Sequence, residues 1–435
     1  MTGLFLSFMS AGQADPLQDQ RDAATAMLEA ILKSDFEAAA KRYDETMLKV
    51  LGPEKLKQTW QQVTDRLGTL KKRTGIRTEA GPKNDFVFIT CEFEKQTLDL
   101  KVAFDKEKRI VGFRFIPTHT PEFAPPSYAK RDAFREEEVV VGKDTEWPLP
   151  GTLAIPKGEG KFACVILLHG SGPHDRDETI GPNKPFRDIA WGLASQGIAV
   201  LRFEKRTKEH GIKFAALKRF SYQEEVIDDA RAAAALLRTH PAIDPKRIIV
   251  AGHSLGAAAA PRVGEQEPGL AGVILLAGNS RPLEDIVLEQ YQYIFSLKGE
   301  LSDDNRQELE KIKKQVARVK DPQLTADVAV SELPLKIPGG YWLYLRNYDN
   351  VATAAKLKMP LLILQGERDY QVTMDDLNGW KKGLASRSDV TFKSYPALNH
   401  LFMEGMGKAR PAEYDKPGHV AKEVIDDIAT WVKAR

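Results

Sequence analysis

The stretch that most constrains this 435-residue chain runs from Arg247 to Ala258 and reads Arg-Ile-Ile-Val-Ala-Gly-His-Ser-Leu-Gly-Ala-Ala. A β-branched apolar run, a serine between two glycines and a start of alanines predict a buried strand, a tight turn and a helix. Gly252 and Gly256 leave out the side chains that would collide where strand and helix pass closely. The turn exposes the hydroxyl of Ser254, and Gly-x-Ser-x-Gly in this setting predicts the nucleophile elbow of a serine hydrolase.

The length and charge of the chain bound its class. A length of 435 residues favours two domains over one small core. Lys and Arg number 63 and Asp and Glu 61, without a long run of one sign, so we expect neither nucleic acid nor an anionic membrane as a partner. The two cysteines, Cys91 and Cys164, lie in apolar strand-like runs of different predicted domains. We therefore expect buried free thiols, with no disulfide and no metal site.

Residues 1–16 are predicted to be a signal-like or disordered segment. Leu4 to Ala11 form an apolar run, and the small residues that follow predict a cleavage site after Ala14. The positive region that begins a signal peptide is missing, because the first basic residue is Arg21. We expect a secreted or periplasmic protein, with a cytoplasmic protein that has a frayed apolar start as the alternative. No run approaches 18 apolar residues, so no membrane span is expected.

Residues 17–117 are predicted to form a small α+β domain. Amphipathic helical stripes come first, at 24–32, 36–48 and 56–67. Strand-like alternation follows, at 86–93, 98–104 and 111–115. Helices followed by a meander predict a sheet curled over helices, which resembles the small cone-shaped domain of the nuclear transport factor 2-like fold. The segment holds no catalytic constellation. Docking, dimerisation of two copies or shielding of substrate are the roles that we expect for it.

Residues 118–133 are predicted to be a linker, because the prolines in this segment are incompatible with a helix or a central strand. From residue 134 to 435, short apolar runs alternate with amphipathic helices. This alternation predicts an α/β fold with a mostly parallel sheet covered on both faces. The strand candidates are residues 163–168, 198–203, 248–251, 273–277 and 361–364.

One insertion, from about residue 281 to 349, breaks this rhythm. It is helical and charged, and then turns aromatic around Tyr341 and Trp342. Because it lies between two strand candidates, we predict a helical lid over the catalytic end of the sheet, with Tyr341 and Trp342 contacting substrate. A surface insertion that packs elsewhere is the alternative.

Two later loops supply the partners that a serine nucleophile needs. His400 follows a strand candidate at 390–395, and an imidazole with a pKa near neutral suits the base. Asp369 follows the strand candidate at 361–364 and is the predicted orienting acid, with Glu367 as the alternative. Serine, aspartate and histidine in this chain order are expected when the elbow stands on this fold.

The negative charge that develops on the substrate oxygen requires backbone donors. The N–H of Leu255, at the predicted helix start, is one candidate. The sequence Leu-His-Gly-Ser-Gly-Pro after an early strand predicts the N–H of Ser171 as the second.

These motifs resemble those of the bacterial α/β-hydrolase superfamily, and more narrowly its carboxylesterase branch, which is grouped with serine aminopeptidase-like hydrolases. The resemblance covers residues 134–435 and is carried by residues 169–178, 252–256, 366–369 and 399–400. It implies Ser254, Asp369 and His400 as the catalytic triad. It also implies Ser171 and Leu255 as the donors of the oxyanion hole. Nearby charged residues are interpreted as a network that braces loops, with contact to a substrate carboxylate as the alternative: Arg176, Asp177, Arg202 and Arg206.

The expected reaction is therefore cleavage of small-molecule carboxylic esters through an acyl-enzyme, without a metal or an organic cofactor. A serine aminopeptidase-like peptidase is the main alternative and would need an acidic pocket for the substrate amine. An acyl thioesterase is a third candidate. A non-catalytic binding protein on this scaffold would be expected to have lost a triad member, and none is missing.

Overall fold

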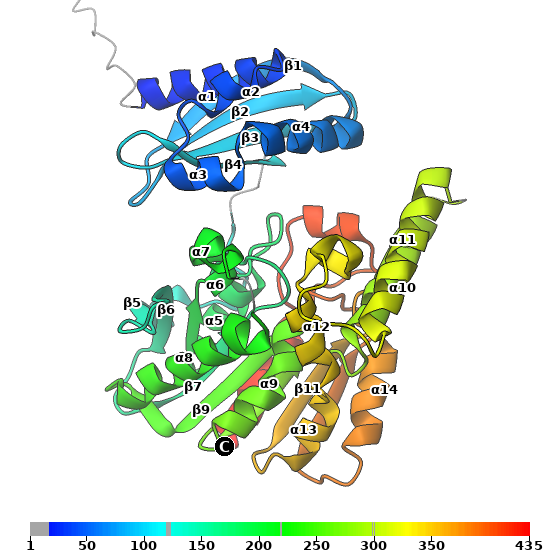
Figure 1. The fold of residues 1–435 in the computed structure, drawn as a ribbon. Helices are drawn as coiled ribbons and strands as arrows, with labels where there is room; N and C mark the ends of the chain where they lie inside the picture. Colours follow the sequence, from blue (N-terminus) through cyan, green and yellow to red (C-terminus); the bar gives the residue numbers. More distant parts are fainter. Residues whose placement is uncertain (1–16, 119–122, 218–219, 298, 300) are drawn as a thin grey trace, which may run out of the picture. The chain divides into compact units, whose positions relative to one another are not determined.

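The computed structural model describes residues 17–118, 123–217, 220–297, 299 and 301–435, which form two compact units divided near residue 120 (Figure 1). The predicted signal-like segment, residues 1–16, lies outside the described residues. Among the described residues, no helix is long and apolar enough to cross a membrane.

The N-terminal unit packs helices on one antiparallel sheet. Its helices come first in the chain: α1 (Gln18–Leu32), α2 (Phe36–Ala40), α3 (Glu45–Val50) and α4 (Pro53–Leu67). The strands follow in the spatial order β1-β2-β3-β4: β1 (Leu70–Glu79), β2 (Asp85–Phe93), β3 (Thr97–Phe104) and β4 (Ile110–Pro117). Alternate residues of β2 and β3, such as Val87, Ile89 and Leu100, join the helical stripes in one apolar core.

Strand β1 was not predicted from the sequence. It reads Leu-Lys-Lys-Arg-Thr-Gly-Ile-Arg-Thr-Glu, and most of its side chains are exposed, so it carries no alternation of apolar and polar residues. It is an edge strand of its sheet. Charged side chains on an edge strand discourage pairing with another chain.

The second unit is built on an eight-stranded sheet with the order β12-β11-β10-β9-β7-β8-β6-β5. Six strands run parallel: β7 (Phe162–Leu168), β8 (Ala199–Phe203), β9 (Ile243–His253), β10 (Gly272–Leu276), β11 (Leu361–Gly366) and β12 (Val390–Tyr395). Two antiparallel strands, β5 (Phe134–Val141) and β6 (Leu149–Pro156), extend one edge. The mostly parallel sheet and the separate small α+β unit confirm the predicted fold class.

Helices cover both faces of this sheet. One apolar core joins it to α8 (Asp228–Thr239), α9 (Leu255–Gln266), α13 (Asn350–Lys356) and α14 (Met374–Gly383). The opposite core joins it to α5 (Pro185–Ala194) and α15 (Lys422–Lys433). Two short helices, α6 (Arg206–Glu209) and α7 (Gly211–Ala215), follow β8.

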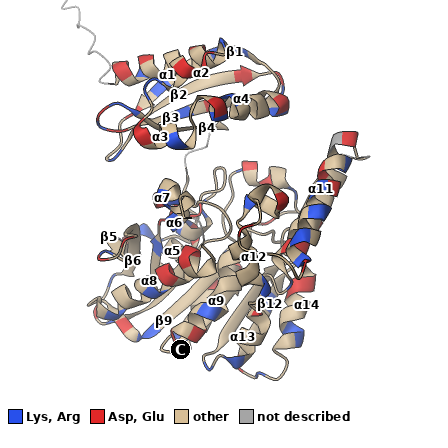
Figure 2. Ribbon diagram, in the orientation of Figure 1, with Lys and Arg blue, Asp and Glu red and all other residues tan. Residues whose placement is uncertain are grey.

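The insertion between β10 and β11 contains α10 (Leu283–Ser296), α11 (Asp303–Lys320) and α12 (Gly339–Arg346). Basic and acidic residues alternate along α11, whereas β7, β10 and β11 of the sheet carry no charged residue (Figure 2). Cys91 and Cys164 are free and buried, as predicted. Burial raises the pKa of the Cys91 thiol to about 11, so it is neutral at physiological pH.

Candidate active site

Ser254 lies at the sharp turn between β9 and α9. Its backbone has φ 54° and ψ −118°, a conformation that is strained for a residue with a side chain. The two glycines of the motif permit this turn. A Cβ on Gly252 would lie 2.1 Å from the carbonyl oxygen of Gly256, and a Cβ on Gly256 would lie 2.3 Å from that of Leu168. The motif therefore folds as an elbow for steric reasons that the sequence already contains.

His400 and Asp369 meet at the carboxyl ends of β11 and β12. The Nδ1 of His400 lies 2.6 Å from Oδ2 of Asp369, and both side chains are buried. The other oxygen of Asp369 accepts the backbone N–H groups of Gln371 and Val372, at 2.7 and 3.1 Å. Because the carboxylate accepts from Nδ1, the hydrogen-bond network assigns the proton to that nitrogen and leaves Nε2 free to accept one.

The loop that carries His400 is fixed by its neighbour Asn399. The buried Asn399 side chain accepts the N–H groups of Leu401 and Met403 through Oδ1, at 3.0 and 3.1 Å. A local side-chain acceptor of this kind holds a turn in place. The alternative acid, Glu367, is exposed and accepts a hydrogen bond from Ser394 at 2.8 Å. Of the two candidate acids, Asp369 is the one that the fold brings to His400.

A cavity of about 280 Å³ joins these residues, and Ser254, His400, Ser171 and Leu255 all line it. Among the described residues, the backbone N–H groups of Ser171 and Leu255 have no protein acceptor. No hydrogen bond joins the Ser254 hydroxyl to His400 in the described part of the chain, and such bonds are often long until a substrate is bound. The rest of the lining is mixed. Its apolar side chains come largely from α10: Leu283, Ile286, Val287, Tyr291, Ile180, Leu335 and Val372. Its other residues are Gly170, His174, Glu178, His253, Asn279, Gln290 and Gln371.

The comparisons with known proteins identify the family of this chain. A family model described as serine aminopeptidase, S33, matches residues 161–405, more than half of the chain. A second model, described as a protein of unknown function (DUF3887), matches residues 24–113. The chain is 35% identical to esterase EstD of Thermotoga maritima over 431 residues, which is 99% of this chain and 98% of the relative. The chain belongs to the serine aminopeptidase S33 family of α/β-hydrolases.

Solved structures are similar to this chain at low sequence identity. An esterase of Pyrococcus furiosus is 16% identical, with a TM-score of 0.44, over 72% of this chain and 96% of that one. Est1E of Butyrivibrio proteoclasticus is 15% identical, with a TM-score of 0.44, over 68% of this chain and 99% of that one.

A buried ion pair that the sequence analysis missed lies beside the elbow. His253 Nδ1 is 2.9 Å from Glu178 Oε2, and His253 Nε2 donates to the carbonyl oxygen of His400 at 2.9 Å. Burial opposes ionisation of Glu178, but the charge of His253 outweighs it and lowers the Glu178 pKa to about 2. Burial likewise opposes protonation of His253, and Glu178 outweighs it and raises the His253 pKa. The available signal was a histidine inside the Gly-x-Ser motif and a glutamate after the Asp-Arg-Asp run.

Tyr341 and Trp342 do not line the cavity, which corrects the prediction that they contact substrate. Both are fully buried. The Tyr341 hydroxyl donates to Glu225 at 2.6 Å, and Trp342 packs on Val319, Leu324 and Leu333 within the insertion. The aromatic run predicted a wall of the site, but these rings form the insertion's own core and its contact with the sheet domain.

The three arginines singled out near residues 169–178 all form ion pairs. Arg176 contacts Glu138 and Glu204, Arg202 contacts Asp177 and Glu136, and Arg206 contacts Asp229. None of the three lines the cavity at Ser254. These contacts agree with a network that braces loops and leave no arginine here for a substrate carboxylate.

Proposed function

We propose that this chain is a serine carboxylesterase in which Ser254, His400 and Asp369 form the catalytic triad. The observation that carries the proposal is the 2.6 Å hydrogen bond between His400 and Asp369, made beside the cavity into which the strained Ser254 projects. The name of the full-length relative, esterase EstD, supports the ester as substrate.

The reaction proceeds by two acyl transfers. Ser254 Oγ attacks the ester carbonyl as His400 Nε2 accepts its proton, and Asp369 holds the imidazole in the tautomer that this step needs. The N–H groups of Ser171 and Leu255 stabilise the tetrahedral anion, each contributing about 3–4 kcal/mol to the lowering of the barrier. His400 protonates the departing alkoxide, and water then releases the acid from Ser254 by the same steps.

The cavity favours small uncharged esters over peptides with a free amine. Apolar side chains such as Ile286, Val287 and Val372 form one part of its wall, and the other part is polar. A substrate amine would need a carboxylate with room to bind it. The carboxylate that lines the cavity, Glu178, already accepts the Gly170 N–H at 2.6 Å and pairs with His253. An aminopeptidase activity is therefore disfavoured by the charges at this site.

The insertion acts as a lid through α10 rather than through its aromatic run. Leu283, Ile286 and Tyr291 of α10 line the cavity. Apolar groups at this position exclude water from the carbonyl under attack, which strengthens the electrostatic contribution of the oxyanion donors.

Two further predictions rest on the sequence alone. Export through residues 1–16 is tested by N-terminal sequencing of the mature protein, which is expected to begin after Ala14. A homodimer formed through the N-terminal unit is tested by sedimentation of the purified chain, and a monomer at all concentrations would contradict it.

The test of the function compares three substrate classes: p-nitrophenyl esters of graded acyl length, an aminoacyl p-nitroanilide and an acyl thioester. We expect turnover of short-chain esters and none after Ser254→Ala. The control Ser394→Ala, at a half-buried serine that does not line the cavity, is expected to retain full activity. Cleavage of the anilide alone would make the protein a peptidase, and a preference for the thioester would make it a thioesterase. Ester hydrolysis that survives Ser254→Ala would overturn the site.

A further inference from the structure

The peptide group between Gly170 and Ser171 carries two functional contacts at opposite ends. Its N–H belongs to Ser171 and lines the cavity as a proposed oxyanion donor. Its carbonyl oxygen, on Gly170, accepts a hydrogen bond of 2.7 Å from the ammonium of Lys205. Lys205 is 3% exposed, so this cation is removed from water and directed at one peptide group.

Lys205 is held in place by a chain of buried contacts. Its Nζ lies 2.7 Å from Oε1 of Glu225, whose other oxygen accepts the Tyr341 hydroxyl at 2.6 Å. Glu225 is 8% exposed, and Tyr341 is 1% exposed. The chain of contacts thus runs from α12 of the insertion to the loop after β7.

Stability alone gives a weak reason for this arrangement. A buried ion pair contributes little net stability compared with apolar side chains of the same volume, because two charges must be removed from water. A charged donor on a carbonyl oxygen, however, forms a strong and directional hydrogen bond. Such a bond also polarises the amide, which makes the N–H of the same peptide group a better donor.

We propose that Lys205 is a positioning residue for the oxyanion hole, which orients and polarises the Ser171 N–H through the carbonyl oxygen of Gly170. This inference rests on the proposed esterase function. Glu225 and Tyr341 hold Lys205 in the required place, and Glu178 fixes the preceding peptide group through the Gly170 N–H. The two groups of opposite charge therefore hold Gly170 from both sides.

The neighbouring residue offers a matched control. Arg206 follows Lys205 directly and forms a second buried ion pair, with Asp229. This second pair does not touch the Gly170–Ser171 peptide group. The test variant, Lys205→Met with Glu225→Gln, and the control, Arg206→Met with Asp229→Asn, each remove one buried pair without leaving a lone charge.

In the test variant, kcat for p-nitrophenyl acetate is expected to fall about 10- to 100-fold with KM changed less than about threefold, since one oxyanion donor is worth about 10²- to 10³-fold. The affinity for an alkyl boronic acid, whose Ser254 adduct places an oxygen in the oxyanion hole, is expected to fall in parallel. In the control variant, both quantities are expected to stay within about twofold. Circular dichroism verifies that both variants are folded.

Three outcomes would overturn the role of Lys205: an unchanged kcat in the test variant, a change in KM alone, or an equal loss in the control. If the test variant does not fold, Tyr341→Phe keeps both charges and removes one hydrogen bond to Glu225. It is expected to lower kcat and boronate affinity together by about threefold, and a change in neither would contradict the proposal. Survival of activity in Ser254→Ala would instead overturn the esterase function itself, so the two failures are distinguishable.

Discussion

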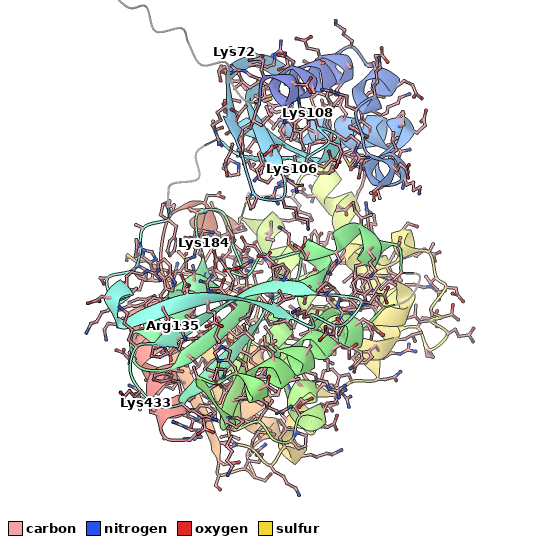
Figure 3. All side chains as sticks on the ribbon, turned by 90° about the vertical axis from the view of Figure 1, so that its left-hand side faces the viewer. Lys72, Lys106, Lys108, Arg135, Lys184 and Lys433 are labelled. Carbon is pink, nitrogen blue, oxygen red and sulfur yellow. The ribbon has the colours of Figure 1, made fainter. Side chains whose placement is uncertain are left out.

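The N-terminal unit and the hydrolase unit both pack helices against a sheet, but they place their charges differently. In the N-terminal unit, ion pairs such as Arg73–Glu29 leave the basic side chain exposed, by 37% in that pair. Lys72, Lys106 and Lys108 likewise lie at the surface of this unit (Figure 3). In the hydrolase unit, Lys205 has a side chain that is only 3% exposed.

The difference shows where each unit can do chemistry. Burying a charge is costly unless it is paired, so a fold retains buried pairs at the expense of simpler apolar packing. The hydrolase unit buries Glu178, His253, Lys205, Glu225, Asp369 and His400, all beside or behind the cavity at Ser254. The N-terminal unit buries two carboxylates, Asp85 and Asp99, each paired with an exposed cation, and fills its core with aliphatic and aromatic side chains. We attribute a structural role to the apolar core of the N-terminal unit. We attribute a role in the proposed reaction to the buried charges of the hydrolase unit.

The largest expected effect is on the buried pair of the proposed triad, Asp369 and His400. Asp369→Asn is expected to lower kcat for p-nitrophenyl butyrate about 10⁴-fold, because the amide no longer holds His400 in the required tautomer. Glu367→Gln, two residues away on the exposed side of the loop, is expected to retain activity within about twofold. If Glu367→Gln caused the larger loss, the acid would be misassigned. Steady-state kinetics of the two variants decides between them.

The N-terminal core is expected to affect stability and leave chemistry unchanged. Phe93 is buried and contacts Phe115 edge-on, with ring centroids 5.3 Å apart. Phe93→Ala is expected to destabilise this unit by about 3–5 kcal/mol, while kcat at 25 °C is unchanged. Calorimetry measures the first quantity and ester hydrolysis the second. Loss of kcat in a variant that is folded at 25 °C would show that the N-terminal unit takes part in the reaction.

Removal of the buried Glu178 charge is expected to lower the free energy of unfolding by an amount that depends on pH. The fall of the Glu178 pKa from 4.5 to about 2 corresponds to about 3 kcal/mol of stability. This stability is complete above about pH 4.5 and is lost as the pH falls toward 2. His253 has a raised pKa, so its share is complete below about pH 6.5 and is lost as the pH rises through the raised value.

The free energy of unfolding of wild type should therefore exceed that of Glu178→Gln most between about pH 4.5 and 6.5. Urea denaturation at a series of pH values, with residual ester hydrolysis as the probe of this unit, measures the difference. A difference that does not vary with pH would mean that Glu178 acts by packing and not by charge.

The smallest effect is expected at an exposed pair. Arg73→Ala is expected to change the free energy of unfolding by less than about 0.5 kcal/mol, because an exposed ion pair gains little in water. The same calorimetric experiment used for Phe93→Ala measures it. A loss as large as that of Glu178→Gln would remove the contrast between surface and buried pairs.

The sequence was sufficient for those parts of the site that local rules determine. The Gly-x-Ser-x-Gly turn follows from sterics at Gly252 and Gly256. Asp369 and His400 follow from topology, since the carboxyl ends of parallel strands lie along one edge of a sheet. Strand β1 could not be predicted because it lacks an apolar pattern.

The parts of the site that depend on distant contacts were not predictable from local pattern. Glu178 and His253 are far apart in the chain, and only the packing of the loop after β7 against the elbow brings them together. The same holds for α10, whose apolar residues resemble those of any amphipathic helix until the helix is placed on the cavity. Tyr341 shows the opposite error. An aromatic residue suits a substrate pocket as well as a core, and the structure places Tyr341 in a core.

The central claim is that Ser254 forms the covalent intermediate, and labelling tests it most directly. Diethyl p-nitrophenyl phosphate is expected to transfer its diethylphosphoryl group to Ser254 Oγ with release of p-nitrophenolate. Intact-mass and peptide-mass spectrometry should then find one adduct per chain, on the peptide that contains Ser254, with parallel loss of ester hydrolysis and no adduct in Ser254→Ala. An adduct on another residue, or full hydrolysis by the labelled protein, would contradict the account.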